Sequence, residues 1–72
     1  MTAKEMFEKL DYDLYRNDSR ITYEKYDKND NCKMIEFIDM KLKIVDEDNE
    51  VYELSLEELQ AINKQVEELG WK

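Results

Sequence analysis

The spacing of apolar residues is helical at both ends of the chain and alternating between them. Residues 2–10 carry apolar side chains at intervals that place them on one side of a helix: Ala3, Met6, Phe7 and Leu10. Thr2 and Glu5 have the spacing of a capping box, which begins a helix. We therefore expect an amphipathic helix over 2–10.

Between the two ends, apolar and polar residues alternate, as in half-buried strands. The alternation predicts four strands separated by turns rich in Asn and Asp, at residues 12–18, 20–27, 32–39 and 41–45. The last of these turns must be tight, near Asp39 and Met40. Both faces of the third strand are partly apolar, which favours a central place in the sheet. After an acidic loop (46–50), residues 51–54 read as a short strand or an extended connection.

The stretch SLEELQAINKQVEELGW (55–71) has the start, the apolar stripe and the end of a complete helix. Ser55 and Glu58 form a second capping box, and Gly70 suits the left-handed position after a helix. Trp71 then falls where an apolar contact back onto the helix closes its end. The residues expected to face the core are Leu59, Ile62, Val66 and Leu69, with Leu56 at the edge.

These elements predict a single α+β domain spanning residues 1–72. An N-terminal helix precedes an antiparallel meander of three to five strands, and a C-terminal helix follows it. Both helices are expected on one face of the sheet. A chain this short has room for one thin core.

The formal net charge of -8 is concentrated in the last third of the chain. Residues 1–45 carry ten acidic and nine basic residues, whereas residues 46–68 carry nine acidic residues and Lys64 alone. Such an acidic segment disfavours direct binding to nucleic acid phosphates and favours a basic protein partner. The alternative is that the charge only keeps the protein soluble.

The outer face of the last helix, together with the loop before it, is the candidate binding surface. Glu67 and Glu68 lie in the last turn, where a carboxylate opposes the helix dipole at a cost of ~0.3–1 kcal/mol each when exposed. An unfavourable residue that no nearby contact compensates suggests a functional reason for its presence. The residues of this acidic strip are Asp46, Glu47, Asp48, Glu50, Glu57, Lys64 and Glu68.

The residue types needed for most catalysis and metal binding are scarce. The chain has no histidine and one cysteine, Cys32, which excludes an intramolecular disulfide and the usual kind of zinc site. Four acids have the spacing of a calcium-binding hand, but Val51 stands where that loop needs glycine: Asp46, Asp48, Glu50 and Glu57. We therefore expect neither an enzyme nor a metal or other cofactor. With no apolar run of membrane-spanning length and no signal peptide, we expect a cytoplasmic protein.

The chain has five tyrosines, all but one in the predicted strands. Tyr12 and Tyr23 fall on the faces expected to form the core. Tyr15 and Tyr26 fall on the opposite faces, where they could form an interaction surface or pack across the sheet. An interface made by Tyr15, Tyr26 and the second apolar face of the third strand would make the protein a homodimeric module.

The two ends of the chain, MTAKEMFEKLDYDLYRND and LEELQAINKQVEELGW, resemble small, mostly uncharacterised proteins encoded by phages and prophages of Gram-positive bacteria. The most specific part is the terminal AINKQxEELGW. The glycine usual in the family's EKLGY segment is replaced here by Asp11. The resemblance implies a small α+β phage accessory protein, and it supplies no catalytic residues.

We therefore expect a non-enzymatic, phage-type accessory protein that binds a basic host or phage protein through the acidic strip. Small acidic phage proteins often act by occupying a host protein. By that analogy, the strip would imitate a nucleic acid backbone, as in an anti-CRISPR or anti-restriction inhibitor. Self-association through the tyrosine face is the alternative function.

Overall fold

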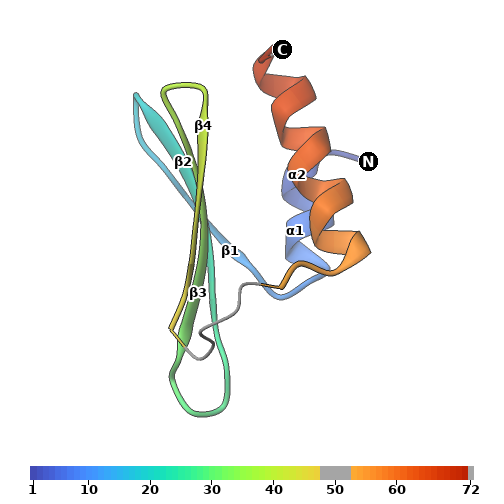
Figure 1. Cartoon of the computed structure of the whole chain (residues 1–72). Coiled ribbons are helices and arrows are strands. Elements are labelled where there is room, and N and C mark those ends of the chain that lie inside the picture. The colour runs from blue at the N-terminus through green and yellow to red at the C-terminus, as the bar shows by residue number, and fades with distance from the viewer. Residues whose placement is uncertain (48–52, 72) are drawn as a thin grey trace.

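The computed structural model describes residues 1–47 and 53–71. Its elements are α1 (Ala3–Glu8), β1 (Asp13–Arg16), β2 (Arg20–Tyr26), β3 (Cys32–Ile38), β4 (Lys41–Asp46) and α2 (Leu56–Leu69). The strands form one antiparallel sheet in the order β1-β2-β3-β4. Figure 1 shows this sheet edge-on, with both helices on the same face. The α+β fold expected from the sequence is confirmed, with four strands. Of the further segment at 51–54, residues 51 and 52 lie outside the described residues.

Both helices begin with the predicted capping boxes. At α1, the Glu5 N–H donates to the Thr2 hydroxyl over 3.2 Å, and the Thr2 N–H donates to the Glu5 carboxylate over 2.9 Å. At α2, the corresponding bonds between Glu58 and Ser55 measure 3.0 and 2.9 Å. These exchanges satisfy backbone N–H groups that have no partner inside the helix.

The end of α2 is also as predicted. Gly70 has a φ of 74°, and the Trp71 N–H donates to the Val66 carbonyl over 3.1 Å, which is the pattern of a Schellman motif. The Trp71 ring lies 6.3 Å from the Phe37 ring, between centroids. The chain end is thereby held against β3.

The end of α1 uses the same motif without glycine. Asp11 has a φ of 70°, and the Tyr12 N–H donates to the Phe7 carbonyl over 3.1 Å. Asp11 therefore adopts the left-handed backbone conformation, which glycine adopts without strain and most other residues avoid. The end of α1 is therefore closed in the same way as the end of α2, with Asp11 in the place that Gly70 takes there.

The turn between β3 and β4 is the predicted tight one. Ile38 pairs with Lys41 across it, so only two residues form the loop. Asp39 and Met40 have φ angles of 51° and 60°, as in a type I′ turn. Met40 is strained in this conformation, and its side chain is 63% exposed.

The core lies between the sheet and the two helices and is centred on the ring of Phe7. This ring stacks on Tyr23 with centroids 3.8 Å apart and meets Tyr12 edge-on at 5.5 Å. Tyr12 and Tyr23 are buried, as expected. The buried apolar residues are Ala3, Phe7, Tyr12, Ile21, Tyr23, Ile35, Phe37, Ala61 and Ile62.

The side of α2 that faces the core is not the one its leucines predict. Leu59, expected in the core, is 45% exposed, and Leu56 is 65% exposed. Ile62 is buried as expected, while Val66 and Leu69 pack at the edge of the core. The buried positions of α2 are Glu58, Ala61, Ile62 and Gln65. The helix is rotated because two of its polar side chains bind buried tyrosines of the sheet layer, and the small Ala61 is turned inward with them.

Candidate functional site

Glu58 is the most buried carboxylate in the described part of segment 46–68, at 6% exposure. Its Oε1 accepts the Ser55 N–H over 2.9 Å, and its Oε2 accepts the Tyr12 hydroxyl. The Lys33 Nζ lies 2.9 Å from Oε2 and also donates to the Glu53 carbonyl over 2.9 Å. One side chain therefore joins the start of α2 to β3 and to the residue before β1.

These contacts set the charge of the cluster. Burial opposes ionisation of Glu58, but the hydrogen bonds from Ser55, Tyr12 and Lys33, with the charge of Lys33, outweigh it and lower the pKa to about 2. Burial first, and then the bond to Glu58 and its charge, raise the pKa of Tyr12 far above its ordinary value. Glu58 is thus a carboxylate and Tyr12 a neutral phenol at neutral pH, which fits a structural role.

A second polar bond joins α2 to the sheet. The Tyr23 hydroxyl donates to the Gln65 Oε1 over 2.6 Å, and both side chains are buried. Burial raises the pKa of Tyr23 to about 12. Without Gln65, the phenol would lose this partner in a dry site, which is costly. The apolar spacing of α2 gave no sign of either polar contact.

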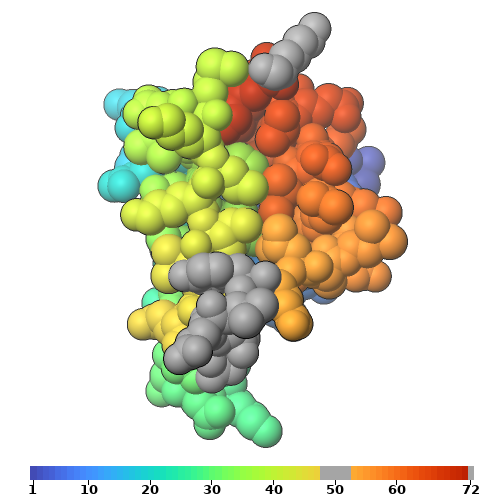
Figure 2. Space-filling view, in the orientation of Figure 1, coloured from blue at the N-terminus to red at the C-terminus, as the bar shows by residue number. Residues whose placement is uncertain are grey.

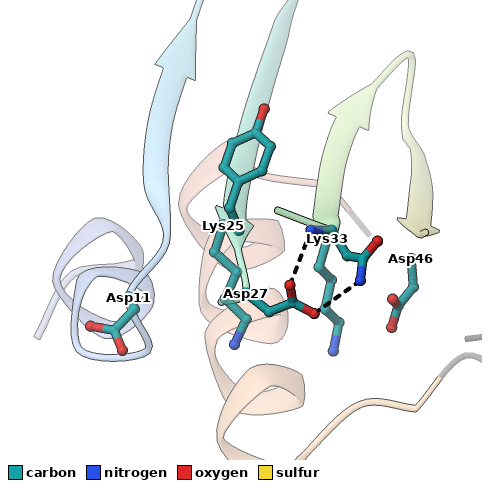
Figure 3. A pocket seen from close by; sticks show the side chains of 7 residues that line it. Asp11, Lys25, Asp27, Lys33 and Asp46 are labelled. Carbon is teal, nitrogen blue, oxygen red and sulfur yellow. Dashed lines mark hydrogen bonds between the residues drawn. The ribbon is translucent and has the colours of Figure 1, made fainter. Parts of the chain in front are cut away.

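A polar hollow of about 320 Å³ opens where the core ends, next to Glu58. Lys25 and Lys33 stand directly opposite each other on β2 and β3. Figure 3 shows their side chains extending in the same direction, with Asp11 on one side and Asp46 on the other. The lining residues are Asp11, Lys25, Tyr26, Asp27, Asn31, Lys33 and Asp46.

Three charged groups of this hollow make contacts within the protein. The Lys25 Nζ donates to the Leu10 carbonyl over 3.5 Å and lies 4.7 Å from the centre of the Tyr12 ring. Asp27 accepts the N–H groups of Asn31 and Asn29, which lower its pKa and build the β2–β3 turn. Lys33 holds Glu58. We therefore interpret the hollow as the polar edge of the core, where charged side chains hold structural contacts.

Glu68 does not stand free on the outer face of α2. Its Oε2 accepts the Ala3 N–H over 2.8 Å, at the first residue of α1. The N–H groups of a helix start carry partial positive charge, which favours a carboxylate there. The unfavourable place of Glu68 at the end of α2 is thus compensated by α1.

The other acidic-strip residues of the helix are spread along it. Glu57 is exposed in the first turn, beside Met1, Met6 and Lys9 of the N-terminal segment. Lys64 pairs with Glu67, with 3.6 Å between Nζ and Oε1. At a rise of ~1.5 Å per residue, Glu57 and Glu68 lie roughly 16 Å apart along the axis. They do not converge on one point.

The acidic residues before the helix lie at the end of β4. The Glu47 carboxylate accepts the Cys32 N–H over 2.9 Å, and Asp46 is half-buried at the polar hollow. Asp48 and Glu50 lie outside the described residues. They are two of the four acids that have the spacing of a calcium-binding hand. In residues 1–47 and 53–71, no group of three or more cysteine and acidic side chains could hold a metal ion.

The predicted tyrosine pair lies on the sheet face opposite the helices. Tyr15 is 54% exposed and Tyr26 is 59% exposed. The Tyr26 hydroxyl donates to Glu24 over 3.3 Å, and the charge of that carboxylate raises the pKa of the phenol. The half-buried apolar side chains on the same face are Cys32, Met34, Ile38 and Val45.

Two further groups on this face shape its chemistry. Glu36 is 8% exposed, accepts the Thr22 hydroxyl over 3.1 Å and has Arg20 at 3.7 Å. Its burial was not predicted, because a single acid in an alternating strand gives no sign of it. Burial first, and then the charge of Glu24, raise the pKa of the Cys32 thiol. That thiol is therefore a poor nucleophile.

Comparisons with protein-family models, curated proteins and solved structures find no match to this chain. Within the described ranges, no helix has the length and apolar character needed to cross a membrane.

Proposed function

We propose that this protein is a non-catalytic interaction protein that binds a basic protein partner through exposed carboxylates of segment 46–68. Figure 2 shows that β4 (yellow) and α2 (orange to red) both reach the surface on one face of the molecule. The described part of this segment has seven carboxylates and one lysine. Within it, Glu58 pairs with Lys33 and Glu67 pairs with Lys64. Four further carboxylates are exposed: Glu53 and Glu57, whose side chains have no described bond, and Glu47 and Glu68, which each accept one backbone N–H.

The strongly shifted groups support a non-catalytic role. Glu58 and Tyr12 are fixed to each other and to Lys33 in protonation states that do not change near neutral pH. The Cys32 thiol is held protonated. A general acid or base needs a pKa closer to the working pH.

A partner that normally binds nucleic acid through lysine and arginine would meet carboxylates on this surface instead of phosphates. Such an association is steered by charge and weakens as salt screens it. The resemblance of both chain ends to phage and prophage proteins favours a host defence protein that binds nucleic acid as this partner. The protein would then be an anti-defence inhibitor of the anti-CRISPR or anti-restriction kind.

Capture from a Gram-positive host lysate tests the proposal with two variants of equal charge change. Glu53→Lys with Glu57→Lys reverses exposed charge on the segment, and neither side chain has a described structural bond. Asp18→Lys with Glu8→Lys makes the same change on other exposed residues. Both variants keep Glu58 and Glu68, which the fold uses.

We expect the wild-type protein to recover basic proteins at about 50 mM salt and to release them at about 300 mM. The segment variant should lose these proteins, whereas the control variant should keep them. If wild type recovers no basic protein, or if both variants bind equally well, the proposed surface is wrong.

A further inference from the structure

The sheet face opposite the helices is electrically divided along the strand direction. At one end, Arg20 pairs across to Ile38, and Ile38 to Lys41, with Lys43 in the next row. Figure 1 shows that no helix covers this face. The basic residues at this end are Arg20, Lys41 and Lys43, with Glu36 buried among them.

The other end of the same face is acidic. Asp13 pairs with Glu24 across β1 and β2, and Glu24 with Met34 of β3. Glu47, directly after β4, accepts the Cys32 N–H. No basic residue lies in these rows of the open face.

Apolar and aromatic groups lie between and beside the two charged ends. Met34 pairs with Val45 near the centre of the face, and both are half-buried although no helix covers them. Tyr15 and Tyr26 present more than half of their surface to solvent. Exposed aromatic side chains of this kind are enriched in protein interfaces.

We propose that this open face is the interface of a homodimer, in which a second copy stacks sheet on sheet. The interface is isologous, so the face must be complementary to itself. This inference concerns the open sheet face and shares Glu47 with the proposed partner surface. The capture variants change Glu53 and Glu57, which lie outside the sheet, so each proposal can fail without the other.

The charge pattern selects one two-fold axis. An axis lying across the strands places the basic end of each copy on the acidic end of the other. In register, Lys41 then faces the partner's Glu47, and Arg20 faces the partner's Tyr26 beside the partner's Glu24. An axis along the strands would instead stack basic end on basic end, which is repulsive.

The size of the face sets the strength of the dimer. Four strands ~4.8 Å apart, with about six residues at ~3.3 Å each, cover roughly 400 Å² per copy. A standard stable interface buries about 800 Å² of accessible surface per partner, so a face this small should associate weakly. We therefore expect a monomer in dilute solution and a dimer when concentrated.

Sedimentation equilibrium on the full chain tests this. The apparent mass should rise from 8.8 kDa toward twice that value between about 5 µM and about 500 µM. Tyr15→Ser with Tyr26→Ser should keep the protein monomeric. The matched control, Leu56→Ser with Leu59→Ser, removes equally exposed apolar side chains from α2 and should leave the dimer intact.

A charge exchange tests the axis. Lys41→Glu places a carboxylate opposite the partner's Glu47 and should weaken the dimer about tenfold. Adding Glu47→Lys restores opposite charges and should restore the dimer. The circular dichroism spectrum of each variant should match that of the wild type.

Three results would overturn the proposal. One is a wild-type protein that stays monomeric at about 500 µM. Another is a dimer that survives the tyrosine substitutions, since it would then use a different surface. The third is a charge exchange that fails to restore a dimer lost through Lys41→Glu, because the axis would then be wrong.

Discussion

The Glu68 carboxylate accepts the Ala3 N–H over 2.8 Å, so the last turn of α2 is bonded to the first turn of α1. A carboxylate at the end of a helix opposes that helix's dipole, but the start of another helix attracts it. The favourable partner is 65 residues away in the chain. The apparent fault in α2 is therefore a contact that holds the two helices together.

Replacing Glu68 with alanine should lower the free energy of unfolding by about 1 kcal/mol. The lost hydrogen bond to a charged group is worth ~1.5–3 kcal/mol, and relief of the α2 dipole returns part of it. Urea denaturation measures the change. Glu67→Ala, in the same turn, removes an exposed carboxylate whose described partner is Lys64, and it should leave stability unchanged or slightly higher. Equal losses for the two variants would refute the role assigned to Glu68.

Stability should fall in acid because of Glu58. Its pKa is lowered from an ordinary 4.5 to about 2 in the folded protein, so its contribution is complete above about pH 5 and is lost as the pH falls toward 2. The shift corresponds to a contribution on the order of 3 kcal/mol. Urea denaturation at a series of pH values measures it. In Glu58→Gln, this part of the acid dependence should be absent; an unchanged profile would contradict the assignment.

Met40→Gly should stabilise the protein by about 1 kcal/mol, because the left-handed backbone costs a non-glycine residue ~1–2 kcal/mol and glycine loses more entropy on folding. Asp-Gly is also a preferred pair in a type I′ turn. Little packing is lost, since Met40 is 63% exposed. Thermal unfolding measures the gain. Met40→Ala keeps the strain and should change little, so an equal gain from alanine would rule out backbone strain as the cause.

Local sequence signals predicted the helices, the strands and the two faces of the sheet. The capping pairs Thr2–Glu5 and Ser55–Glu58 mark both helix starts, and Gly70 marks the end of α2. Alternation placed Tyr15 and Tyr26 on the outer side of the sheet. These signals act over a few residues, so one sequence is enough to show them.

The rotation of α2 and the use of its acids could not be predicted in this way. Spacing alone assigns leucine to the core and glutamate to the surface, yet Leu59 is exposed and Glu58 is buried. The reason lies far along the chain, because Glu58 and Gln65 bind tyrosines 46 and 42 residues away. For the same reason, the sequence showed an acidic strip without showing which of its carboxylates the fold uses.

Glu57 and Glu58 are neighbours in the first turn of α2 with opposite surroundings, one exposed and one bound to Lys33 and Tyr12. The most direct measurement is the free energy of unfolding at pH 7 for Glu57→Gln and Glu58→Gln side by side. Removing one partner of a buried ion pair costs ~3–5 kcal/mol, so Glu58→Gln should lose about 3 kcal/mol. Glu57→Gln, on the free acidic surface, should lose less than about 0.5 kcal/mol. Equal losses, or a Glu58→Gln protein as stable as wild type, would contradict the division of this segment into structural and free carboxylates.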